Sequence, residues 1–250
     1  MPRALPEAIV VPFGVAGWSP AEVCYAAVSR PTRAVASFPC LLLPPDMAEP
    51  LRLNNVPVDL FAGSDAPIDR ADPLATLRDR IMALCDPWNH STTLFLSRYF
   101  RAIEACVLAD AEAIAAGSAG CPGLFEPRDW VYSAPCPLPR AHLRAPGGTA
   151  GEDHIAVDIA FWSGSGFIAV DTAPPRLLPN AARQRRERLA ATGIVVIDRL
   201  PMADDPAAWR ALFAALLAPP LTAFWQGEAV PLGCFRSDAL DILDARVLGH

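Results

Sequence analysis

The clearest pattern of apolar and polar positions lies in the second half of the chain. Residues 154–162 (HIAVDIAFW) and 167–172 (FIAVDT) are two β-rich runs separated by the four-residue turn SGSG. Glycines in a short loop allow the positive φ that tight turns need, so the pattern predicts a β-hairpin. A helix is expected next over 179–192, then an apolar strand over 194–197 and a helix over 204–218. This order predicts an α/β fold with a mixed β-sheet flanked by helices.

The first half is interrupted by prolines, with short apolar runs between them. These runs predict strands at 8–11, at 35–38 continuing into 40–43, and at 56–61. Two helices should follow. The first spans 73–84, and the second is a long helix from Thr92 to Ala116 that Ser91 caps and Gly117 ends.

The core-facing stripe of the long helix repeats at spacings of three and four residues. It consists of Leu96, Phe100, Ile103, Val107 and Ile114. The chain then divides into three parts by composition. These are a proline-rich N-terminal α/β part over 1–120 that includes the helix at about 92–116, a proline-rich linker over 121–150, and an α/β core over 151–250.

Composition narrows the classes of protein. Hydrophobic residues make up 52% of the 250 positions, which excludes intrinsic disorder. All 21 basic residues are arginine, so no lysine is present for a Schiff base or a phosphate-binding loop. None of the seven cysteines forms a CxxC pair, as expected for buried thiols in a reducing cytoplasm. We expect a cytoplasmic protein with no signal peptide and no membrane segment, because the apolar stretch 207–217 is too short to span a bilayer.

Two acids hold corresponding places in the predicted hairpin. With a four-residue turn, Trp162 lies opposite Phe167, and the same register puts Asp158 opposite Asp171, roughly 5 Å apart at the Cβ atoms. Facing carboxylates repel each other unless a proton, an arginine or a cation lies between them. Oxygen ligands at this separation suit Mg²⁺ or Mn²⁺. The alternative is two acids on a solvated sheet face, or acids paired with arginines.

The predicted helix after the hairpin is strongly basic. It carries Arg183, Arg185, Arg186 and Arg188, whereas the whole chain has a net charge of −6. A basic helix in an acidic protein is typical of a binding surface for phosphate or for an acidic partner. The alternative is an exposed face whose arginines pair with the protein's own acids.

The segment from Asp158 to Leu200 resembles the core of the PD-(D/E)XK nuclease superfamily, in particular its very-short-patch-repair endonuclease type. VDIAFWSGSGFIAVDT, RQRRERLAATG and IVVIDRL follow the same order of acid-bearing strand, tight turn, second acid, arginine-rich helix and apolar strand. The resemblance implies a restriction-endonuclease-like module in which Asp158 and Asp171 hold a divalent metal ion that activates water against a phosphodiester. It also implies Glu104, on the long helix, as a third acid.

One position departs from this pattern. The superfamily's lysine lies two residues after the second acid, where this chain has Ala173. Arginine is a poor replacement as a base, because it stays protonated at any workable pH. The resemblance therefore leaves two alternatives, an active endonuclease and a catalytically inactive relative.

The sequence leads to two hypotheses of function. The first is a metal-dependent nucleic-acid phosphodiester hydrolase, or its inactive form, with Mg²⁺ or Mn²⁺ as cofactor and nucleic acid as partner. The second is a non-catalytic accessory or assembly protein that uses the degenerate nuclease-like fold to hold an acidic protein partner. Trp18, Trp88 and Trp130 lie in predicted loops, where tryptophans usually anchor packing and less often stack on bases.

Overall fold

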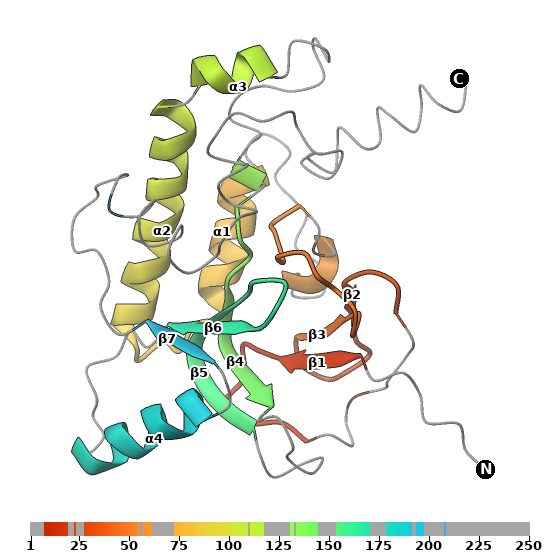
Figure 1. Cartoon of the computed structure of the whole chain (residues 1–250), viewed down its shortest axis with the longest axis vertical. Coiled ribbons are helices and arrows are strands. Elements are labelled where there is room, and N and C mark those ends of the chain that lie inside the picture. Colours follow the sequence, from red (N-terminus) through yellow and green to blue (C-terminus); the bar gives the residue numbers. More distant parts are fainter. Residues whose placement is uncertain are drawn as a thin grey trace. The chain divides into compact units, whose positions relative to one another are not determined.

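The structure is a computed structural model (Figure 1). It describes residues 8–19, 23, 28–54, 56, 58–61, 73–109, 111–117, 131–132, 134–144, 154–170, 179–191, 194–197 and 208. The chain divides into two compact units. The first comprises Met1–Glu49, Pro57–Leu96 and Pro137–Leu200, and the second comprises Pro50–Val56, Ser97–Cys136 and Pro201–His250. The first unit therefore draws on both the part expected as N-terminal and the part expected as a separate core.

A small antiparallel sheet forms from the N-terminal residues of the first unit. Its order is β1 (Ile9–Pro12), β3 (Cys40–Leu43), β2 (Thr32–Arg33), so β3 is the central strand. All four residues of β3 are buried, which explains its continuous apolar sequence CLLL. The expected strands at 8–11 and 40–43 are confirmed, whereas part of the run at 56–61 forms the short 3₁₀ helix η2 (Val58–Phe61).

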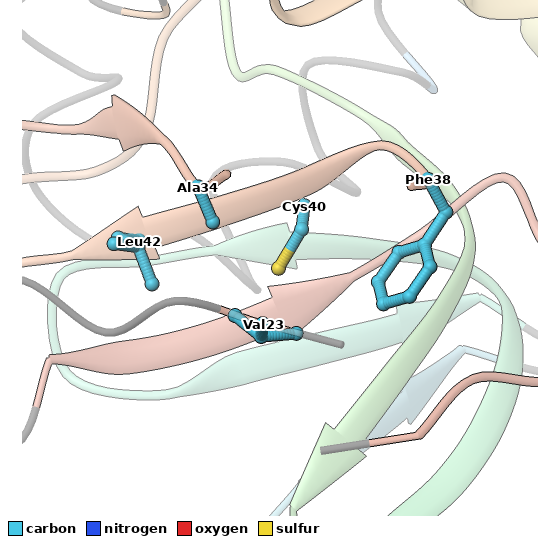
Figure 2. Close-up of a cluster of buried hydrophobic side chains, with 5 residues drawn as sticks. All are labelled: Val23, Ala34, Phe38, Cys40 and Leu42. Atoms are coloured by element: carbon cyan, nitrogen blue, oxygen red, sulfur yellow. The ribbon is translucent and has the colours of Figure 1, made fainter. Parts of the chain in front are cut away.

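One face of this small sheet carries a compact apolar cluster (Figure 2). Cys40 and Leu42 of β3 pack there with three further buried side chains, Val23, Ala34 and Phe38. Figure 2 shows the Cys40 sulfur pointing toward Val23, with the Phe38 ring beside it. The cluster gives the N-terminal residues a core of their own within the first unit.

The second sheet of the first unit is the mixed sheet that the sequence predicts. Its order is β4 (Leu138–Arg144), β5 (His154–Trp162), β6 (Phe167–Val170), β7 (Val195–Ile197). The pairs β4–β5 and β5–β6 are antiparallel, and β6–β7 is parallel. The helix α4 (Pro179–Ala191) lies between β6 and β7 in the chain, as a parallel connection requires.

The hairpin register is the one that the turn length predicts. Trp162 pairs with Phe167, and Ile159 pairs with Val170. The turn is closed by the Ser163 N–H, which donates to the Gly166 carbonyl at 2.9 Å, and Gly164 within it has a φ of +91°. The hairpin and the strand at 195–197 are thus confirmed over the residues described.

The expected linker over 121–150 needs correction, because its residues 138–144 form β4. Pro139 is compatible with a strand here because β4 lies at the edge of the sheet, where a missing N–H donor is tolerated. Its carbonyl also accepts the Gly14 N–H at 2.8 Å, which ties the N-terminal segment to β4.

The helices also differ in part from the expectation. The helix α1 (Pro73–Ala83) matches the predicted span, but the long helix is two helices, α2 (His90–Ala109) and α3 (Ala111–Gly117). Asn89, rather than Ser91, precedes the first turn of α2. The predicted core stripe is confirmed where side chains are described, since its first four members are buried: Leu96, Phe100, Ile103 and Val107.

The second unit is built on the later part of α2. Residues 51–54 pair antiparallel with residues 134–136. The Leu53 N–H donates to the Ala134 carbonyl at 2.9 Å, and the Cys136 N–H donates to the Leu51 carbonyl at 2.8 Å. The Tyr99 hydroxyl donates to the Pro135 carbonyl. The phenol of Tyr99 is completely buried, and this burial raises the pKa of Tyr99 well above its ordinary value. The predicted helix at 204–218 lies outside the described residues.

Candidate functional site

The candidate site begins with the turn between α1 and α2, whose sequence is Asp86-Pro87-Trp88-Asn89. The Asp86 carbonyl accepts the Asn89 N–H at 2.9 Å, and the Asp86 side chain accepts the Trp88 N–H, also at 2.9 Å. Asp at the first position and Pro at the second are the residues that favour such a turn. The local sequence therefore favours this turn.

Asn89 connects this turn to α2 and to the sheet. Its side-chain oxygen accepts the Thr92 N–H at 3.4 Å, which makes Asn89 the N-cap of α2. Its side-chain nitrogen donates to Asp158 Oδ1 at 3.3 Å. Because the oxygen is taken by the helix, the amide presents its donor side to the carboxylate.

Asp158 lies in β5 and is half-buried. The adjacent residues Val157 and Ile159 are buried. Because successive side chains of a strand point to opposite faces, the Asp158 carboxylate lies on the other face from these two side chains. The structure thus gives this acid a defined amide donor and partial access to solvent.

Arg140 occupies the position opposite Asp158 on β4. The flanking pairs Pro139–Ile159 and Ala141–Val157 fix this register. Arg140 has a φ of 49° and is the one non-glycine residue with positive φ in the part of the chain described. A non-glycine residue in this region costs about 1–3 kcal/mol and persists where the surrounding structure imposes it.

The thiol of Cys85 lies within the electrostatic influence of both Arg140 and Asp158. Burial raises the pKa of Cys85 to about 11; the charge of Arg140 lowers it, and the charge of Asp158 raises it. Both charges therefore act on the same buried thiol at the end of α1. The cluster of Cys85, Asn89, Arg140 and Asp158 is called the Asp158 cluster below.

The second predicted acid, Asp171, lies outside the described residues. The confirmed register ends at the pair Ile159–Val170, one position short of Asp158 and Asp171. The pairing of the two acids therefore stays a prediction.

Glu104 is exposed on α2 and belongs to the second unit, whereas Asp158 belongs to the first. The role of Glu104 as a third acid therefore stays a prediction.

The predicted basic helix is α4. Arg183 and Arg188 are exposed, and Arg183 Nε lies 3.6 Å from a carboxylate oxygen of Glu187, one turn further along. The side chains of Arg185 and Arg186 lie outside what is described. Leu189 anchors the helix, since it is buried and its carbonyl accepts the Ile194 N–H at 3.2 Å.

Sequence reasoning missed Asn89 and Arg140. The motif DPWN carries a usable signal for Asn89, because an Asp-Pro turn followed by Asn before a helical pattern indicates an N-cap. Arg140 gave no such signal, because its place depends on the pairing of β4 with β5.

Comparisons of the chain with protein-family models, with curated proteins and with solved structures found no match. Within the described ranges, no group of three or more His, Cys, Asp or Glu side chains is arranged to hold a metal ion. The helices that the structure describes include none with the length and apolarity to cross a membrane.

Proposed function

We propose that this protein is a nucleic-acid phosphodiester hydrolase of the PD-(D/E)XK type, active or inactive, that acts with a divalent cation at Asp158 and Asp171. The observation that carries the proposal is the order of the mixed sheet. An acid-bearing strand, a tight hairpin, a basic helix and a parallel apolar strand follow one another as the sequence resemblance implies.

The Asp158 cluster supports the proposal through its chemistry. The half-buried Asp158 carboxylate, with an amide donor at 3.3 Å, is held in place and keeps partial access to solvent. Arg140, on the neighbouring strand, adds a positive charge close to the acid. Such a charge favours the approach of a phosphate group.

The proposed cation is Mg²⁺ or Mn²⁺, and Asp158 is the one of its two proposed ligands that the structure describes. Asp158 supplies carboxylate oxygen, which both ions prefer, and Asp171 would complete the pair from the neighbouring strand. A bound cation would polarise the phosphodiester and lower the pKa of water. In the hydrolysis itself, the water oxygen bonds to phosphorus, one P–O ester bond breaks, and the water proton goes to the departing oxygen.

The basic helix α4 supports nucleic acid as the partner. The exposed Arg183 and Arg188 offer charge to a phosphate backbone, and a single glutamate, Glu187, stands between them. Arginines on one exposed helix are typical of phosphate contacts that position nucleic acid.

The test measures cleavage and binding together. Plasmid, single-stranded DNA and RNA are incubated with the full chain in Mg²⁺, in Mn²⁺ and in EDTA, and binding to the same nucleic acids is measured by filter retention. Asp158→Asn and Asp171→Asn should each reduce the rate of any cleavage by about 100-fold or more, because each removes a ligand charge. Asp79→Asn is the matched control, since Asp79 is 69% exposed and pairs with Arg78.

The outcomes separate the forms of the proposal. Metal-dependent cleavage that both variants lose supports the active enzyme, and binding without cleavage supports the inactive relative. A chain that neither binds nor cleaves any of these nucleic acids would overturn the proposal.

A second candidate is favoured by one observation, the absence of lysine from an acidic chain. In that case the module is an accessory or assembly protein, and α4 docks an acidic protein. A pull-down from the native host that Arg183→Ala and Arg188→Ala abolish, with negligible nucleic-acid affinity, would support this candidate.

A further inference from the structure

The turn before α2 holds one aromatic side chain out in solvent. Trp88 is 78% exposed, although its backbone is fixed on both sides by the hydrogen bonds from Trp88 and Asn89 to Asp86. Pro87 restricts the backbone further, since its ring fixes φ. The indole is therefore presented by a rigid segment.

Other described tryptophans of the first unit serve packing, and Trp88 does not. The Trp18 ring lies edge-on to Phe38 and to His154, with centroid distances of 6.1 Å and 4.5 Å. Trp162 is 7% exposed and packs edge-on against Phe167 at 5.0 Å. An indole that is left in water while Trp18 and Trp162 pack against other rings is available for a ligand.

The position of Trp88 points to the Asp158 cluster. Its next neighbour in the chain is Asn89, whose amide donates to Asp158 at 3.3 Å, and adjacent Cα atoms are about 3.8 Å apart. The exposed indole therefore lies one residue along the chain from the side chain that contacts Asp158.

We propose that Trp88 is a stacking platform for an unpaired nucleobase, so that the substrate carries a single-stranded segment at the Asp158 cluster. The inference rests on the proposed function and adds the substrate class to it. Bases inside a duplex already stack on their neighbours, so an exposed indole gains most from a base that is unpaired. A backbone that the turn already fixes loses little freedom on binding, which favours the stacked state.

The test compares single-stranded and duplex oligonucleotides of the same base composition. Binding is measured by fluorescence anisotropy in Ca²⁺, so that cleavage does not interfere, using the full-length chain. The variants are Trp88→Ala, Trp88→Phe and the control Leu94→Ala, which truncates another exposed apolar side chain (49% exposed) on the first turns of α2. Urea unfolding midpoints of all variants establish that each is folded.

We expect Trp88→Ala to weaken single-strand binding by about tenfold or more, since stacking on an aromatic ring is worth that much per base. Trp88→Phe should retain most of the affinity, and duplex binding should hardly change. An abasic site moved along the single strand should remove the effect of Trp88→Ala at one position, where the indole meets its base.

The failures are distinguishable. Unchanged single-strand affinity in Trp88→Ala, or equal losses on single strand and duplex, would overturn the stacking platform and leave the proposed function standing. A wild-type chain that binds no nucleic acid would remove the proposed function instead. Loss of a protein partner with unchanged nucleic-acid affinity would assign Trp88 to a protein interface and overturn the inference.

Discussion

Gly164 and Gly166 lie in the same hairpin turn, but a methyl group at each would meet different surroundings. A Cβ at Gly164 would lie 2.2 Å from the backbone oxygen of Ala48, and the φ of this glycine is +91°. A Cβ at Gly166 would meet nothing within 4 Å. We expect Gly164→Ala to lower the free energy of unfolding by about 2–3 kcal/mol.

The matched variant Gly166→Ala should change it by less than about 0.5 kcal/mol. Urea titration of both variants checks this. Equal midpoints would show that the hairpin tip is free to move away from Ala48.

Buried thiols make stability depend on alkaline pH. Burial raises the pKa of Cys40 to about 12, from an ordinary value of 9.0. The native state therefore keeps this proton where the unfolded chain loses it. The stabilisation is complete below pH 9 and is lost as the pH rises toward 12, at about 1.4 kcal/mol per pH unit.

Cys40→Ala should remove this part of the pH dependence while lowering stability at pH 7. Urea unfolding of both proteins at pH 7, 9 and 10.5 measures the difference. Parallel curves for the two proteins would contradict the assignment to Cys40.

At this scale the sequence predicted burial better than polar contacts. The stripe that includes Leu96 and Phe100 follows from helical periodicity alone, because burial needs one face and no particular partner. The bond from Asn89 to Asp158 joins positions 69 residues apart, so it depends on the contact of the turn before α2 with β5 rather than on local pattern.

Among the elements, α4 offers a test of its role that folding does not obscure. Arg183 and Glu187 are both about two-thirds exposed or more, so their ion pair contributes little to stability. Changing the exposed Arg183 and Arg188 to Ala should alter the free energy of unfolding by less than about 0.5 kcal/mol. If both meet phosphate, the slope of log affinity against log salt should fall by about 1.4–1.8.

Nucleic-acid titrations at several salt concentrations measure this slope. Glu187→Gln, which removes the one acid beside Arg183, should strengthen binding at low salt. An unchanged slope in the double variant would exclude these two arginines from the contact.

The elements that the sequence predicted best are those with local signals. The hairpin follows from its glycine turn and the two β-rich runs beside it, and α4 follows from the proline at its first position and its polar residues. The prolines Pro137 and Pro139 favour a loop, so the sequence predicts a linker where β4 forms, and only the pairing with β5 makes this segment a strand. The run ending at Phe61 was too short for its pattern to separate strand from helix, and it forms η2.

For the whole molecule, the first unit depends on segments far apart in sequence. β4 pairs with β5 and also accepts the Gly14 N–H through Pro139. We expect a fragment of residues 151–250, which lacks β4 and the N-terminal sheet, to be unfolded because the apolar side chains of β5 lose their cover.

Circular dichroism and proton–nitrogen correlation spectra of this fragment, beside the full chain, measure the effect. The longer fragment 137–250 restores β4 but not the N-terminal sheet, so it separates the two contributions. A well-dispersed spectrum from 151–250 would show that the module folds alone.

The imidazole of His142 lies 3.0 Å from the carbonyl oxygen of Val15, across a sequence separation of 127 residues. During synthesis at about 5–20 residues per second, the N-terminal segment therefore waits roughly 6–25 s for this partner. The apolar strand Cys40–Leu43 is synthesised during this interval, before β4 exists. The contact between Val15 and His142 can therefore form only after β4 has been synthesised, so the first unit cannot be complete before that point.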